Sequence, residues 1–142
     1  MTKTRSFLLV IASLVAVNAA SSFTLERNLS AGVYPIDADS IGLPLVEGFI
    51  ASALLLVLLA VAIFIPKDQP FGSATSVVLC GVAGFISAEY AVFWAIPHHY
   101  TMAVAYGGVL IICGLLAASY ARKLASNIAV KRDAPKAARP LP

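Results

Sequence analysis

Glu89 is the residue whose type and position point most directly to chemistry, because it is the one acid inside a long apolar run. A carboxylate in hydrocarbon is costly, so such residues tend to face a bundle interior and to mark proton or ion pathways. In an antiparallel helical hairpin centred on His98, Glu89 lies level with Gly107 and close to Tyr106. Asn18 falls at comparable depth in the first apolar run. We predict an intramembrane polar site in which Tyr106 or Asn18 hydrogen-bonds Glu89. The alternative is a structural acid, or one that reaches outward to the interface.

Two adjacent histidines, His98 and His99, follow the same run, and Asp37, Asp39 and Glu47 are expected on their side of the membrane. Imidazole and carboxylate groups together can bind zinc or copper. Neighbouring histidines seldom point at one ion, however, and the chain has no third histidine. A solvated turn is therefore the favoured interpretation. We predict no metal and no cofactor, with His98 and His99 as the alternative metal ligands.

The two cysteines, Cys80 and Cys113, both lie within apolar runs. Their spacing fits no zinc or haem-attachment pattern, so they are interpreted as small buried hydrophobic residues. The sequence also lacks a phosphate loop, a nucleophile elbow, and HExxH and CxxC motifs. Nothing in it indicates an enzyme, and a non-enzymatic role is favoured.

The elements that must position these residues are long apolar helices. Of 142 residues, 60% are hydrophobic and only 12% are charged, whereas soluble domains carry about 25% charged residues. The apolar residues gather in four runs, at about 6–23, 47–65, 73–96 and 100–121. Helices of about 18 to 24 residues span roughly 27–36 Å, which matches a hydrocarbon core of about 30 Å. We predict an all-α polytopic membrane bundle of four transmembrane helices. Its membrane domain covers 1–121 and includes an outer loop at 24–46.

The basic residues set the predicted orientation. The segment 122–142 holds six Lys and Arg against one acid, Asp133, and is expected to be a disordered cytoplasmic tail. With the N-terminus inside, nine of the ten Lys and Arg lie on the cytoplasmic side and only Arg27 lies outside. The sequence thus predicts an integral protein of the plasma (inner) membrane with both termini in the cytoplasm. The lipid bilayer is the expected partner, and nucleic acid is not.

The first run has a second interpretation. Lys3 and Arg5 precede the apolar stretch 7–17, and cleavage after Ala19 would make residues 1–19 a signal peptide. The mature chain would then have three spans. Retention of the run as a fourth helix is the favoured interpretation. The triplet Asn28-Leu29-Ser30 matches a glycosylation sequon on the predicted outer side.

Small residues predict which helices pack closely. Along 73–96 a small residue recurs every four positions, at Ser76, Cys80, Gly84 and Ala88. Close packing of small residues drives helix association in lipid, so 73–96 and 100–121 are expected to form a tight hairpin. The middle of 47–65 is instead crowded with leucine, at Leu54, Leu55, Leu56, Leu58 and Leu59. These leucines are expected to face lipid.

The predicted function is that of a non-enzymatic accessory or structural subunit, in a homo-oligomer or a larger membrane complex. Such a role needs packing faces and no polar pathway. The alternative is a transporter or channel component in which Glu89 handles a proton or a cation. A third hypothesis is a metal-linked or redox enzyme that uses His98 or His99.

Overall fold

The chain is helical in nearly all the residues that the structure describes. The computed structural model describes residues 2–32, 38–95 and 100–137, in which there is no strand. The helices are α1 (Lys3–Ser30), α2 (Ala38–Phe64), α3 (Pro70–Ala95) and α4 (Tyr100–Ala137). The all-α class predicted from the sequence is therefore confirmed.

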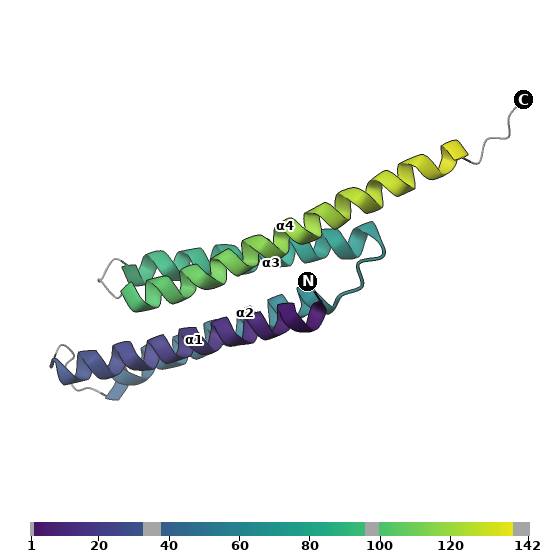
Figure 1. Ribbon diagram of the computed structural model, residues 1–142. Helices are drawn as coiled ribbons and strands as arrows, with labels where there is room; N and C mark the ends of the chain where they lie inside the picture. Colours follow the sequence, from purple (N-terminus) through teal and green to yellow (C-terminus); the bar gives the residue numbers. More distant parts are fainter. Residues whose placement is uncertain (1, 33–37, 96–99, 138–142) are drawn as a thin grey trace, which may run out of the picture.

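The helices run alternately up and down as two antiparallel pairs, α1 with α2 and α3 with α4 (Figure 1). The most extensive interface joins α3 to α4, and further contacts join α1 to α4 and α2 to α3. Each helix therefore has two helical neighbours, as in an up-down-up-down bundle. The N-terminus lies at the same end as the link between α2 and α3, and α4 projects beyond the other helices at that end (Figure 1).

The face that α4 turns to the bundle repeats at intervals of four and three residues. Its buried side chains are Met102, Tyr106, Val109, Cys113, Leu116 and Tyr120. A period of 3.5 residues keeps one seam of a helix facing its neighbour and favours left-handed crossing. On α3, Ser76, Cys80 and Gly84 lie on the buried face, as the small-residue spacing predicts, whereas Ala88 is only partly buried. The expected α3–α4 hairpin is thus formed.

The leucines of α2 differ from the expectation. Leu54 is exposed, as predicted, but Leu55 and Leu59 are completely buried in the core. A helix that is apolar on every side carries no polar face to mark its inside. Composition therefore could not tell which leucines pack against α1 and α3 and which face outward.

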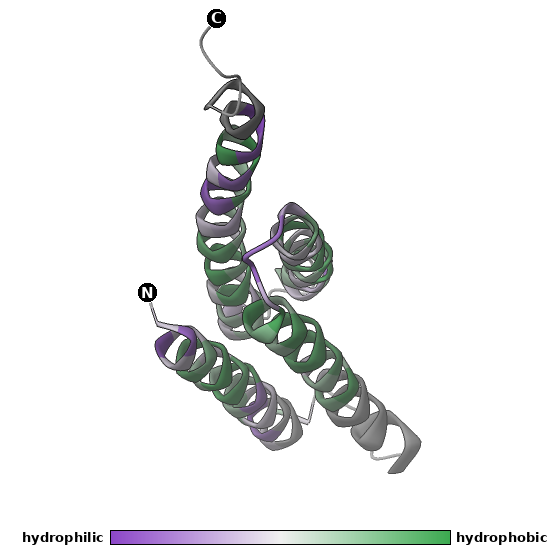
Figure 2. Cartoon of the chain, turned by 90° about the vertical axis from the view of Figure 1, so that its right-hand side faces the viewer, coloured by the Kyte–Doolittle hydropathy of each residue, from purple (hydrophilic) through white to green (hydrophobic). Residues whose placement is uncertain are grey.

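Three helices have segments long and apolar enough to cross a membrane: Lys3–Thr24, Pro70–Ala95 and Tyr100–Arg132. In α2 the described apolar segment, Gly48–Phe64, is shorter. Hydrophobic residues run along the length of the helices, and hydrophilic ones gather near both ends of α1, at the α2–α3 link and along the outer part of α4 (Figure 2).

α1 and α2 extend into the predicted outer loop. α1 continues to Ser30 and α2 begins at Ala38, so most of the expected loop 24–46 is helical. α1 ends just before Gly32, whose φ of 64° is a left-handed conformation that glycine adopts without steric cost.

α4 continues to Ala137, although disorder was expected from residue 122. The segment 121–132 consists mostly of good helix formers such as alanine, lysine, arginine and leucine. These residues extend the helix past the apolar span, to Ala137. Residues 138–142 lie outside the described part of the chain.

Substitution of Gly84 tests the α3–α4 packing. A Cβ added there would lie 3.4 Å from Cys113 Cβ and 3.5 Å from Leu110 Cδ1, so alanine fits and a larger side chain does not. We expect Gly84→Leu to destabilise the protein by about 1–3 kcal/mol through overpacking. Thermal unfolding in detergent, followed by circular dichroism, measures this change.

Gly81→Leu is the matched control, because a Cβ at Gly81 meets nothing within 4 Å. It should leave the midpoint nearly unchanged. Equal losses of stability at Gly81 and Gly84 would contradict the close α3–α4 contact.

Candidate functional site

Glu89 lies on the exposed face of α3 rather than between the helices. One turn before it is Phe85, 66% exposed, and one turn after it is Phe93, 57% exposed. Val82 and Val92 also lie exposed on this side of the helix. Within the described residues, the Glu89 carboxylate makes no hydrogen bond and no ion pair. The acid is thus a single polar group on an apolar outer surface.

Tyr90, rather than Glu89, lies against Tyr106. The two tyrosine rings stack with their centroids 5.1 Å apart and their planes 19° apart. This pair agrees with the register predicted from the sequence, in which Glu89 lies level with Gly107, but α3 is rotated so that Tyr90 rather than Glu89 faces α4. Tyr106 is fully buried, and its hydroxyl has no hydrogen-bond partner within the described part of the chain. The predicted bond from Tyr106 to Glu89 is not formed.

Asn18 contributes to a different contact. Its Nδ2 donates to Ser52 Oγ at 3.1 Å and to the carbonyl oxygen of Leu14 at 2.9 Å. The side-chain bond ties α1 to α2 across the bundle. Asn18, Tyr106 and Glu89 therefore do not form one polar site in this structure.

Ser76 and Ser87, which are buried on α3, bond to backbone carbonyls. Ser76 Oγ lies 2.9 Å from the carbonyl oxygens of both Ala62 and Gly72, and Ser87 Oγ donates to Ala83 at 2.8 Å. These hydroxyls are held in place by the helices. They offer no acid or base for a chain of proton transfers.

The richest polar contact is at Lys67, in the link between α2 and α3. Its Nζ donates to the carbonyl oxygens of Ile63 at 2.8 Å and Ile65 at 2.9 Å. The same ammonium lies 4.6 Å from the centre of the Tyr120 ring on α4. Carbonyls at a helix C-terminus lack partners within the helix and carry partial negative charge. Lys67 thus caps α2 and attaches it to α4 by a cation–π contact.

The backbone of Lys67 is equally engaged. Its carbonyl oxygen accepts from Asn127 Nδ2 at 2.9 Å and from Ser73 Oγ at 3.3 Å. Next to it, Gly72 lies so close to the link that an added Cβ would overlap the carbonyl oxygen of Pro66. Only glycine permits this approach. The Lys67 turn therefore joins α2, the start of α3 and the outer part of α4.

Lys67 is only 8% exposed, and its ammonium has no acid against it in the described residues. Burial lowers the pKa of Lys67 below its ordinary value, and the nearby charges of Lys3 and Lys123 lower this pKa further. Three lysines, from the start of α1, the link and α4, thus form a cluster of like charge at one end of the bundle.

The remaining candidates are the predicted metal ligands and the two cysteines. His98, His99 and Asp37 lie outside the described residues. Among the described residues, no three His, Cys, Asp or Glu lie close enough together to hold a metal ion. Cys80 and Cys113 are buried and are not joined in a disulfide.

The contacts that Lys67 makes with Asn127 and Tyr120 were not predicted from the sequence. Lys67 was counted only for its charge, and Asn127 was assigned to a disordered tail. One signal was present: Tyr120 and Asn127 are seven residues apart, which places them on one face if the helix continues.

Comparisons of this chain with protein-family models, curated proteins and solved structures found no match. The class of protein is therefore set by the fold: an all-α, four-helix chain in which three helices are long and apolar enough to cross a membrane.

Replacing Lys67 tests whether its turn holds the bundle. Lys67→Met keeps an apolar stem but removes the donors to Ile63 and Ile65 and the charge over Tyr120. We expect a loss of about 1–3 kcal/mol in the free energy of unfolding, because buried carbonyls lose their partners. The substitution also removes the repulsion between Lys67 and the exposed Lys3 and Lys123. Water screens this repulsion, so its removal offsets little of the lost stability.

Lys123→Met is the control: it makes the same chemical change at an exposed lysine. It should alter the stability by no more than about 0.5 kcal/mol. Thermal unfolding in detergent compares the two variants. If both had the same midpoint as the wild type, the Lys67 turn would not be a structural requirement.

Proposed function

We propose that the protein is a multi-pass membrane protein that crosses the bilayer four times. The carrying observation is the apolar outer surface, with exposed side chains such as Val15, Phe85 and Leu115 on three different helices. Surface of this kind is unfavourable in water over a large area and is expected against lipid. α2 takes part as the fourth span, because it runs antiparallel beside α1 and Leu55 and Leu59 are buried in the shared core.

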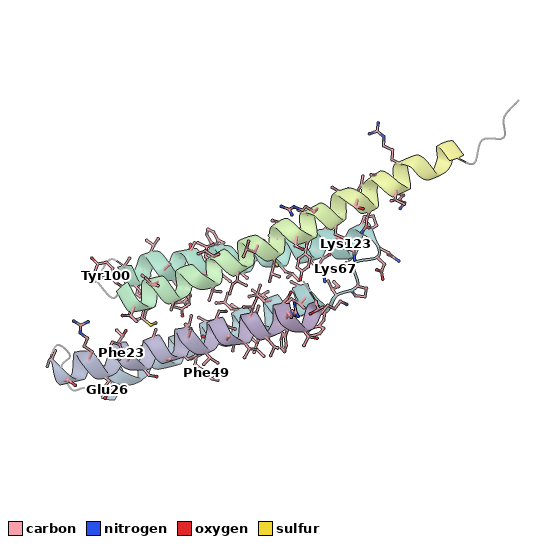
Figure 3. All side chains as sticks on the ribbon, viewed as in Figure 1. Phe23, Glu26, Phe49, Lys67, Tyr100 and Lys123 are labelled. Carbon is pink, nitrogen blue, oxygen red and sulfur yellow. The ribbon has the colours of Figure 1, made fainter. Side chains whose placement is uncertain are left out.

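The orientation follows from the ends of the bundle. Lys67 and Lys123 lie at one end, together with the N-terminus, whereas Glu26 and Tyr100 lie at the other (Figure 3). A cytoplasmic position for the lysine-bearing end agrees with the positive-inside rule. We place both termini in the cytoplasm and the protein in the plasma (inner) membrane.

Within the membrane we propose a non-enzymatic accessory or structural role, in which the exposed face of α3 binds a helix of another subunit or of a second copy. Glu89 supports this role. An acid on a lipid-facing surface without a partner is unfavourable, and a polar side chain from a neighbouring helix would satisfy it. The flanking Phe85 and Phe93 would supply the apolar part of that contact.

A transporter that uses Glu89 has less support. A transport acid is expected to face the bundle interior or a water-filled path. Glu89 faces outward, and the buried Ser76 and Ser87 hydroxyls are engaged by backbone carbonyls. No described contact leads from Glu89 into the bundle.

Reporter fusions test the topology. A reporter that is active only in the cytoplasm should be active after Pro142 and silent when inserted after Gly32. Activity at Gly32 would overturn the orientation. The mass of the mature chain checks the first span: loss of residues 1–19 would show a cleaved signal peptide and three spans.

Paired substitutions of Glu89 test the proposed role. Glu89→Gln keeps a hydrogen-bonding side chain, so the variant should assemble and function nearly normally. Glu89→Leu should fold but associate about fivefold less, since a hydrogen bond between membrane helices contributes roughly 1 kcal/mol. Cross-linking and co-purification in mild detergent measure assembly, and the deletion phenotype measures function.

Val82→Leu is the control, as it changes the same face of α3 without a polar group. It should assemble like the wild type. A Gln variant that folds and assembles but is inactive would favour the transporter instead. Unchanged assembly of the Leu variant would show that Glu89 is not a contact residue.

A further inference from the structure

A cavity of about 270 Å³ opens at the end of the bundle that carries the N-terminus. It lies between α1, the α2–α3 link and α4, and its lining includes all three clustered lysines, Lys3, Lys67 and Lys123. Lys67 and Lys123 are seen at this end in Figure 3. The cavity is thus a place where positive charge from three parts of the chain converges.

The positive charge at this cavity is not compensated by the chain. Lys67 donates hydrogen bonds to the carbonyl oxygens of Ile63 and Ile65, and its ammonium lies over the Tyr120 ring. None of these groups carries a full negative charge. Lys3 and Lys123 are exposed and make no ion pair with a described acid. Bringing like charges together is unfavourable, so an anion at the cavity would stabilise this end of the bundle.

The walls of the cavity have the opposite character. Leu9 of α1 and Ile112, Leu115 and Leu116 of α4 line it. A free inorganic anion makes no favourable contact with such a surface, whereas an acyl chain gains van der Waals attraction from it. Basic pockets between membrane helices on the cytoplasmic side are suited to acidic lipid headgroups.

We propose that this cavity binds an anionic membrane phospholipid. Its phosphate lies at Lys3 and Lys123, above the buried charge of Lys67, and an acyl chain lies against Leu9 and Leu116. The inference rests on the proposed insertion into a membrane. It is independent of the subunit role of Glu89, which lies on another face of the bundle.

Lipid titration of the full-length protein in detergent tests the site. Phosphatidylglycerol and phosphatidylcholine with identical acyl chains are compared by native mass spectrometry and by the shift in unfolding midpoint. We expect selective binding of phosphatidylglycerol. Affinity should fall about thirtyfold in Lys3→Gln/Lys123→Gln, because each lysine near an anionic surface contributes a factor of about five. Lys67 is left in place because it caps α2.

Two further variants separate a specific site from general attraction. Arg122→Gln/Lys131→Gln removes the same charge from exposed α4 positions outside the cavity and should retain binding. Leu9→Trp keeps every charge and fills the apolar wall, so it should weaken phosphatidylglycerol binding. If the lysine variant failed to fold, Leu9→Trp would still decide the question.

Three outcomes would overturn the proposal. Phosphatidylcholine could bind as tightly as phosphatidylglycerol, the lysine variant and its charge control could lose the same affinity, or Leu9→Trp could bind phosphatidylglycerol as the wild type does. Inorganic phosphate forms the last arm: stabilisation by phosphate equal to that by the lipid would identify a free anion as the occupant. Failure of the lipid site would leave the reporter topology intact, whereas failure of membrane insertion would not.

Discussion

The burial of one ammonium group, that of Lys67, sets the geometry of one end of the molecule. A buried charge is tolerated only where its protons find acceptors, and Lys67 finds them in the last carbonyls of α2 and in the face of Tyr120. Its own carbonyl then holds Ser73 at the start of α3 and Asn127 on α4. Three helices are thereby fixed to one residue, in a link too short to position them by packing alone.

The register of the α3–α4 hairpin could be predicted from the sequence, but the rotation of α3 could not. Only residues 96–99 separate α3 from α4, and so short a link fixes which residues of the two helices lie level with one another. The Tyr90–Tyr106 stack agrees with the predicted register. Successive residues on a helix differ by about 100°, so one position separates the partly buried Tyr90 from the exposed Glu89. Where a helix is apolar over most of its surface, hydropathy does not choose between these faces, so the outward position of Glu89 could not be predicted.

The Lys67 turn escaped prediction because its partners are far away in the sequence. Asn127 lies 60 residues from Lys67, and the contact exists only because α4 continues beyond its apolar span. The basic composition after residue 121 predicts a cytoplasmic tail but gives no reason to expect a tertiary contact. The alanine, lysine and arginine residues of this segment favour a helix, and the side-chain amide of Asn127 on that helix reaches the α2–α3 link.

The distribution of polar groups connects the fold with the proposed functions. Asn18, Ser76 and Ser87 are satisfied within the bundle, where each bonds to backbone or to a neighbouring helix. The Tyr106 hydroxyl differs from them, because it is buried and has no partner within the described residues. Glu89 on the outer face of α3, and Lys3 and Lys123 at the cavity, are exposed and make no ion pair within the described residues. The proposed subunit contact at Glu89 and the proposed lipid at Lys3 and Lys123 would each bring a partner from outside the chain to a charge at its surface.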